Sequence, residues 1–211
     1  WAMRLQRSED GKLALQAGQQ QTRFRLRPGE SVRTPSILLV FWNGSDRYHG
    51  HNLLRQLLLK HYTPRIDGEV AVPPVTQNTW YTYNGNGVTE QNQLEAIRQM
   101  APLGVEGYWL DAGWFEVGWP AGVGNWFPQK KGFPNGLKCL GDAAHQRGMK
   151  FILWFEPERV APGSQIAREH PEWVLHAGDG DGLFNLADPA AREWLTNHLV
   201  KCVTDWGVDV Y

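Results

Sequence analysis

The sequence of 211 residues has few cysteines and no long apolar run, and both absences exclude classes of protein. Only two cysteines occur, Cys139 and Cys202. Each lies in a stretch of helical character, so the sequence predicts neither a disulfide framework nor a zinc site. No apolar run approaches the roughly 18 residues that cross a bilayer, and no signal peptide opens the chain. We therefore expect no membrane partner and a cytoplasmic rather than a secreted protein.

An excess of charge of one sign is also absent. Lysine and arginine together number 21, aspartate and glutamate number 22, and the formal net charge is -1. No basic stretch is long enough to follow a phosphate backbone. Nucleic acid is therefore not an expected partner.

The common cofactor motifs are missing as well. The sequence has no glycine-rich dinucleotide turn after a strand, no P-loop, no His-Glu-x-x-His and no nucleophile elbow. Residues 179–182, Asp-Gly-Asp-Gly, resemble part of a calcium loop but lack its distal acid. We expect neither a metal nor an organic cofactor.

Tryptophan, by contrast, is abundant. The chain has eleven, and several stand beside glycine, asparagine or acidic residues rather than deep in apolar runs. Indoles in such places often form platforms on which sugar rings stack. For Trp114, Trp119 and Trp126 two interpretations stay open, a sugar platform or packing of the long loop that carries them.

One strand-like run leads directly into a cluster of carboxylates. Lys150–Phe155 is nearly continuous apolar sequence, which predicts a strand buried on both faces of a parallel sheet. Pro157 follows and cannot donate to a central ladder, so pairing should stop there. Glu156 and Glu158 are then presented at the end of the strand. From the residues alone they are the natural acid pair.

Two other runs have the same design. Val105–Leu110 ends in Asp111, and Thr76–Tyr81 carries Trp80 near its end. Three strand ends therefore converge on acidic and indole side chains. In a (β/α)8 barrel the functional groups lie at the carboxyl ends of the strands.

The pattern along the chain divides it into three parts. Residues 1–47 predict the trailing strands of a β-sandwich, 48–74 a connecting helix and linker, and 75–211 alternating strands and helices. Strands in the first part are expected at 12–16, 22–26 and 36–41. In the third part, helices are expected at 89–100, 136–147, 164–170 and 189–206, and a fourth strand begins at 208–211. The alternation favours the α/β class and a (β/α)8 barrel.

Several short motifs follow one another along the chain. Each is weak evidence alone, but their order and spacing together are specific for one family. They are Asn78-Thr79-Trp80, Tyr-Trp-Leu-Asp-Ala-Gly-Trp-Phe at 108–115, Phe-Pro-Asn-Gly-Leu at 133–137, Gly-Met-Lys-Phe at 148–151, Trp-Phe-Glu-Pro-Glu at 154–158 and His-Pro-Glu-Trp at 170–173. Together they resemble the glycoside hydrolase family 36 α-galactosidases, the melibiase group. The resemblance covers most of the chain from Pro28 onward.

The resemblance implies retaining hydrolysis of terminal α-galactosides by a barrel domain. Such a reaction needs two carboxyl groups about 5 to 5.5 Å apart, one as nucleophile and one as acid/base. In the family the nucleophile is an aspartate at the end of the fourth strand, and Val208–Tyr211 resembles the start of that strand. We therefore assign no catalytic residue in this chain and expect both catalytic carboxyl groups beyond Tyr211. The chain is then a fragment that holds the end of the β-sandwich and the first half of the barrel.

The resemblance also implies a substrate-binding set. Asp111 matches the aspartate that accepts hydrogen bonds from galactose hydroxyls, Trp80 matches a tryptophan at the first strand end, and Trp154 matches one that lines the pocket at the third. With Trp114 and Glu156 these form the predicted binding residues. For Glu156, the resemblance favours a second role as a support that hydrogen-bonds neighbouring loops.

Two departures from the family bear on the sugar. Ala112 stands where many members have a second aspartate, and residues 179–185 carry no basic residue where an arginine is expected. They favour a divergent subgroup and leave alternatives open, namely an α-N-acetylgalactosaminidase, a β-L-arabinopyranosidase, or a non-catalytic carbohydrate-binding or structural module. The expected partner is an α-galactoside or a related carbohydrate, and the full-length protein is a candidate homo-oligomer.

Overall fold

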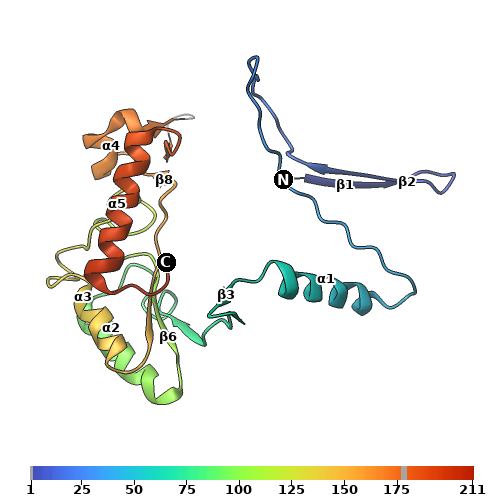
Figure 1. Ribbon diagram of the computed structural model, residues 1–211. Coiled ribbons are helices and arrows are strands. Elements are labelled where there is room, and N and C mark those ends of the chain that lie inside the picture. The colour runs from blue at the N-terminus through green and yellow to red at the C-terminus, as the bar shows by residue number, and fades with distance from the viewer. Residues whose placement is uncertain (1, 177–179) are drawn as a thin grey trace. The chain divides into compact units, whose positions relative to one another are not determined.

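The computed structural model describes residues 2–176 and 180–211. The chain divides into two units, Trp1–Val72 and Pro73–Tyr211, which are coloured blue to cyan and green to red in Figure 1. The division falls inside the stretch predicted as a linker.

Unit 1 contains one long hairpin, one helix and one short hairpin. Strands β1 (Ala2–Arg7) and β2 (Leu13–Gly18) pair antiparallel, α1 spans Arg47–His61, and β3 (Arg65–Ile66) pairs with β4 (Glu69–Val70). The strands predicted at 22–26 and 36–41 are wrong for this structure, because both stretches are irregular. A strand needs a neighbour to bond its backbone, and these stretches have none in the described part of the chain.

Unit 2 is built on a parallel sheet in the order β5-β6-β7 (Thr76–Asn78, Gly107–Leu110 and Lys150–Leu153). Gly107 is opposite Thr76 on one side and Lys150 on the other. Beyond β7, Val210 forms a parallel bridge with Ile152, and the Leu153 N–H donates to the Val210 carbonyl at 3.0 Å. At the predicted start of a fourth strand, Val210 therefore forms a single bridge to β7.

Side chains cap the first turns of two helices of unit 2. Thr89 and Asn92 form a capping box at the start of α2 (Glu90–Met100), and Asp188 accepts from two backbone N–H groups at the start of α5 (Pro189–Trp206). The other elements are α3 (Lys138–His145), α4 (Gln165–Glu169), the 3-10 turns η1 (Ala101–Leu103) and η2 (Pro171–Trp173), and a small antiparallel sheet of β8 (Arg159–Val160), β10 (Gly182–Phe184) and β9 (Val174–Leu175). Among the described residues, no helix combines the length and apolar character that a membrane crossing requires.

Helices α2 and α3 cover one face of the parallel sheet. Tyr108 and Phe151 on this face are fully buried, and their rings stack at 5.7 Å between centroids. The Tyr108 hydroxyl donates to Gln93 Oε1 of α2 at 2.7 Å, so the buried hydroxyl has a partner. Gly141 of α3 permits a close approach of α5, because a Cβ there would lie 2.1 Å from the Trp206 carbonyl oxygen.

A half-buried histidine connects α5 to the long loop between β6 and α3. His198 Nε2 lies 2.8 Å from the Trp126 carbonyl oxygen, which only accepts, so Nε2 carries the proton. The ring also stacks on Trp194 at 5.1 Å. Burial lowers the pKa of His198, and the charge of Lys201 lowers it further, whereas the bond to Trp126 raises it and is outweighed.

This histidine should make stability depend on pH. The pKa of the ring is about 6.5 in the unfolded chain and lower in the folded one, so folding favours the neutral ring. The contribution of His198 to the free energy of unfolding is therefore complete above pH 6.5. It is lost as the pH falls through the lower folded pKa. We expect the free energy of unfolding, measured by urea titration, to fall between pH 7 and pH 5, and to fall less in His198→Gln. The same exchange at exposed His61 is the control, and equal slopes in all three proteins would contradict this role.

Candidate functional site

The carboxyl ends of β5 and β6 are joined by side-chain hydrogen bonds. Asn78, the last residue of β5, donates from Nδ2 to Asp111 Oδ2 at 2.6 Å, and its Oδ1 accepts from the Trp80 N–H at 2.8 Å. Asp111 follows β6 directly, and its Oδ1 accepts from the Ala112 N–H at 2.7 Å. The two strand ends therefore fix the orientation of the Asp111 carboxylate.

A cavity of about 290 Å³ opens at these strand ends, and we call it the inner cavity. Its lining residues are Asn78, Trp80, Tyr81, Asp111, Ala112, Trp119 and Trp154. The structure thus brings together three of the predicted binding residues, Trp80, Asp111 and Trp154. They come from three strands because parallel strands present their carboxyl ends at one edge of the sheet.

Trp114 does not belong to this set, and its predicted contact with substrate is wrong. Its side chain has no exposed surface, and its Nε1 donates to the Trp154 carbonyl oxygen at 2.8 Å. Edge-to-face contacts at 5.2 to 5.7 Å surround the ring with Phe115, Phe155 and Trp206. Trp114 therefore belongs to the hydrophobic core, and its hydrogen bond holds the backbone of Trp154.

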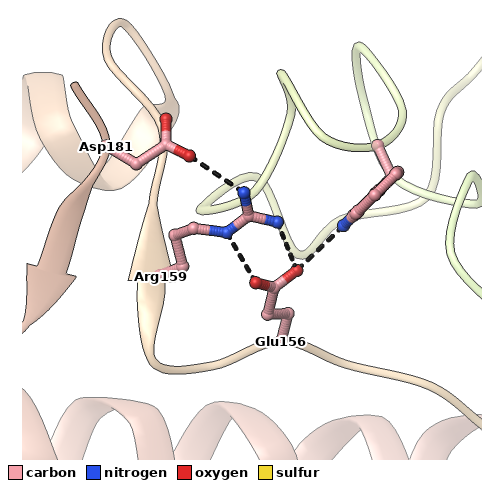
Figure 2. Close-up of polar contacts among 4 residues, drawn as sticks. Glu156, Arg159 and Asp181 are labelled. Carbon is pink, nitrogen blue, oxygen red and sulfur yellow. Dashed lines mark hydrogen bonds and ion pairs between the residues drawn. The ribbon is translucent and has the colours of Figure 1, made fainter.

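Glu156 is bound to protein groups and not directed at a ligand, so the prediction of direct contact is corrected. Arg159 binds it in a bidentate pair, with Nε 2.5 Å from Oε1 and Nη2 2.7 Å from Oε2. Oε2 also accepts from Trp119 Nε1 at 2.9 Å. Figure 2 shows the Arg159 guanidinium between Glu156 and Asp181, whose Oδ2 is 3.0 Å from Nη1. Glu156 is thus a support for the loop, which is the role that the family resemblance favours.

The electrostatics of this cluster keep Glu156 ionised. Burial alone raises the pKa of Glu156, but the hydrogen bonds from Arg159 and Trp119 outweigh it, and the pKa lies below the usual value. Glu158 is exposed. An acid pair made of Glu156 and Glu158 is therefore not supported, because a general acid must hold a proton near neutral pH.

The calcium-like segment lies partly outside the described residues, since Asp179 is not among them. Within the described part, Asp181 is paired with Arg159, and no cluster of three or more His, Cys, Asp or Glu side chains is placed to hold a metal ion.

Sequence reasoning did not assign every residue that shapes the walls of the cavity. Asn78 belongs to the Asn-Thr-Trp motif at 78–80, one of the motifs on which the family resemblance rests, and this was a signal that it contributes to the site. Trp119 was one of three indoles with no periodicity to separate packing from binding. Asn86 was not predicted to have a role, although its side chain forms two hydrogen bonds with the Trp119 backbone, at 2.7 and 2.8 Å.

The lining of the inner cavity suits a neutral polyhydroxylated ligand. Within the described residues Asp111 is its one carboxylate, and this group accepts hydrogen bonds from hydroxyls. Three indoles offer apolar faces to the C–H face of a sugar ring. The cavity can therefore bind a sugar, but a retaining hydrolysis needs a second carboxyl about 5 Å away.

Comparisons with known proteins agree with this chemistry. A family model described as Melibiase matches residues 31–207. The probable alpha-galactosidase C of Aspergillus terreus is 32% identical over 204 residues, an alignment that covers 85% of this chain and 26% of the relative. The chain spans about a quarter of the length of the curated relatives it matches.

The solved structures that resemble this chain are also alpha-galactosidases. The alpha-galactosidase of Lactobacillus brevis superposes with a TM-score of 0.60 and 30% identity over 66% of this chain and 20% of that one. The GH36 alpha-galactosidase AgaA of Geobacillus stearothermophilus gives a TM-score of 0.59 and 26% identity over 64% of this chain and 20% of its own. These neighbours belong to a family that combines a β-sandwich with a TIM barrel.

Proposed function

We propose that this chain, which belongs to the melibiase family, supplies the sugar-binding part of a retaining α-galactosidase. The observation that carries the proposal is the position of Asp111 with Trp80 and Trp154 around one cavity at the ends of three parallel strands. The Asp111 carboxylate accepts hydrogen bonds from sugar hydroxyls, and the indoles contact the apolar face of the ring.

The fold that we propose for this part is the first half of a (β/α)8 barrel. Helices cover one face of the β5-β6-β7 sheet, and the other face borders an apolar hollow of about 390 Å³ lined in part by Trp109, Ile152 and Val210. A closed barrel fills such a face with side chains from its remaining strands. Unit 1 then corresponds to the end of the sandwich domain.

The catalytic pair belongs to strands that follow Tyr211 in this proposal. The nucleophile would attack the anomeric carbon and the acid/base would protonate the leaving oxygen, while Asp111 and the indoles hold the terminal sugar in place. Proton transfer alone activates the leaving group, so the reaction uses no metal or organic cofactor.

The relatives support the proposed substrate class. They are named alpha-galactosidases, and variants of Geobacillus stearothermophilus AgaA have been solved in complex with stachyose and with raffinose. A second candidate is an α-N-acetylgalactosaminidase. It is favoured by Ala112, whose small side chain lines the inner cavity where many family members carry a second aspartate.

The test is turnover by the product of the complete reading frame that contains this chain. We expect it to release the phenol from an aryl α-galactoside faster than from the matching α-N-acetylgalactosaminide or β-L-arabinopyranoside. Preference for either of the other glycosides would assign a different sugar to the same site. Sugar binding in calorimetry without turnover of any of the three would contradict an enzyme and favour a carbohydrate-binding module.

A further inference from the structure

The sequence contains four Asn-Gly pairs, at residues 43–44, 84–85, 86–87 and 135–136. In such a pair the backbone nitrogen of glycine can attack the side-chain amide carbon of asparagine, because glycine has no Cβ to hinder the approach. The attack needs a nitrogen that no other backbone group holds and an asparagine side chain that lies beside it. All four pairs belong to the described part of the chain, so the structure shows which of them meets both conditions.

Three of the pairs hold the glycine nitrogen in a backbone turn. In each, the glycine N–H donates to the carbonyl oxygen of a residue three to five positions earlier, at 2.8 to 3.0 Å. These bonds join Gly85 to Trp80, Gly87 to Tyr83, and Gly136 to Phe133. Such a nitrogen reacts only after the turn opens, and local opening costs free energy.

Two of these three pairs also have a restrained asparagine side chain. The Asn86 amide is bonded to both backbone groups of Trp119, at 2.7 and 2.8 Å. Asn135 donates from Nδ2 to Glu90 Oε1 at 2.9 Å, so its amide is held toward the start of α2. Neither amide can turn toward its glycine without losing these partners.

The pair at 43–44 differs from the other three. The Gly44 N–H donates to Asn43 Oδ1 at 2.9 Å, and the described residues offer it no backbone acceptor. Because Oδ1 is bonded to Cγ, this contact places the nitrogen beside the carbon that it would attack. Both residues are exposed, and no heavy atom lies within 4 Å of the position that a Gly44 Cβ would take. Water therefore reaches the pair, and nothing crowds the ring that the attack would form.

We propose that Asn43 is a modification site, at which the folded protein undergoes spontaneous deamidation through Gly44. The Gly44 nitrogen gives its proton to solvent and forms a bond to Asn43 Cγ. The bond between Cγ and Nδ2 breaks, and Nδ2 takes up a proton and leaves as ammonia. Water then opens the cyclic imide at either of its carbonyl carbons, which leaves aspartate or isoaspartate at position 43. The reaction consumes one water, releases one ammonia, and needs no oxidant or enzyme.

The modified residue lies in a short link between two fixed points of unit 1. Trp42 packs on α1, because a Cβ at Gly50 would lie 2.7 Å from its ring. Asp46 is the N-cap of α1 and accepts from the Tyr48 N–H at 2.9 Å. Residues 43–45 join these points. Either product adds a negative charge before the start of α1, and isoaspartate also lengthens the backbone of the link by one carbon atom.

The test measures conversion at each of the four asparagines in the product of the complete reading frame. The folded protein is incubated at mildly alkaline pH in water enriched in ¹⁸O, then digested and mapped by mass spectrometry. The water that opens the imide leaves one labelled oxygen, so the label marks conversion during the incubation. We expect conversion at Asn43 to be about tenfold faster than at Asn84, Asn86 or Asn135, because only those three must first open a turn.

The same incubation in guanidinium chloride removes the influence of the fold. All four asparagines precede glycine, so their rates in the unfolded chain should agree within about threefold. Asn43→Gln is the control variant, because a glutamine would have to close a larger ring and reacts more slowly. It should abolish the conversion at position 43 and leave the rates of the other three asparagines unchanged.

The outcomes decide the inference without reference to hydrolase activity. Equal rates at all four asparagines of the folded protein, or faster conversion at one of the three held pairs, would overturn it. A preference for Asn43 that persists undiminished in guanidinium chloride would also overturn it, since the neighbouring sequence and not the fold would then be the cause. A preference that is present in the folded protein and lost on unfolding would support it, whether or not the protein cleaves an α-galactoside.

Discussion

Asp111→Asn should lower kcat/KM for an α-galactoside roughly a hundredfold, because the variant replaces charge-assisted hydrogen bonds to the sugar. Both oxygens of Asp111 already face donors, Oδ1 the Ala112 N–H and Oδ2 the Asn78 amide. An asparagine must turn its NH₂ group toward one of these donors, so it loses either the bond from the Asn78 amide, which links β5 to β6, or the bond from the Ala112 N–H. The same turn removes an acceptor that the sugar would use.

The measurement is steady-state hydrolysis of an aryl α-galactoside by the product of the complete reading frame, with urea unfolding of each variant beside it. Asp142→Asn is the control, since Asp142 is an exposed aspartate of α3 that pairs with Lys138 at 2.6 Å. It removes the same charge from a residue that does not line the cavity and should leave kcat/KM unchanged. Asp111→Asn with wild-type kinetics would remove Asp111 from the binding site.

The parallel strands and the helices of unit 2 could be predicted because their signals are local, whereas the small sheet of β8, β9 and β10 was not predicted. The prediction of a helix at 189–206 matches α5, because Asp188 before Pro189 and Gly207 after Trp206 mark both ends. The predictions of strands at 22–26 and 36–41 were wrong because strand formation depends on a partner that is distant in the sequence. Their alternating pattern describes a half-buried face, but a strand forms only where another strand bonds it, and no local signal supplies that neighbour.

The site was predictable where a rule of topology applies. The common location of Asp111, Trp80 and Trp154 is predictable because parallel strands place their carboxyl ends at one edge of the sheet. This rule does not depend on the conformation of the loops. The roles of Trp114, Trp119 and Glu156 depend on how the loop from 113 to 134 packs. Its tryptophans are five to seven residues apart and show no period, so the sequence cannot separate a ring that fills the core from one that faces a ligand.

Trp114→Ala should destabilise unit 2 by roughly 3–5 kcal/mol, the usual cost of removing a buried aromatic ring. The ring fills the space between Phe115, Phe155 and Trp206, and its N–H satisfies the Trp154 carbonyl oxygen. Urea unfolding of the 211-residue chain measures this loss. Trp119→Ala is the matched control in the same loop and should cost much less, because that ring is only half-buried.

A third variant, Trp114→Phe, separates a packing role of Trp114 from a binding role. Trp114→Phe keeps most of the packing and loses the bond to Trp154, so it should cost about 1 kcal/mol from the hydrogen bond. Because the Trp114 side chain has no exposed surface and does not line the inner cavity, sugar affinity should fall in proportion to the unfolded fraction and not beyond it. A Trp114→Ala protein that unfolds at the wild-type urea concentration but binds sugar weakly would return Trp114 to the binding site, against its complete burial.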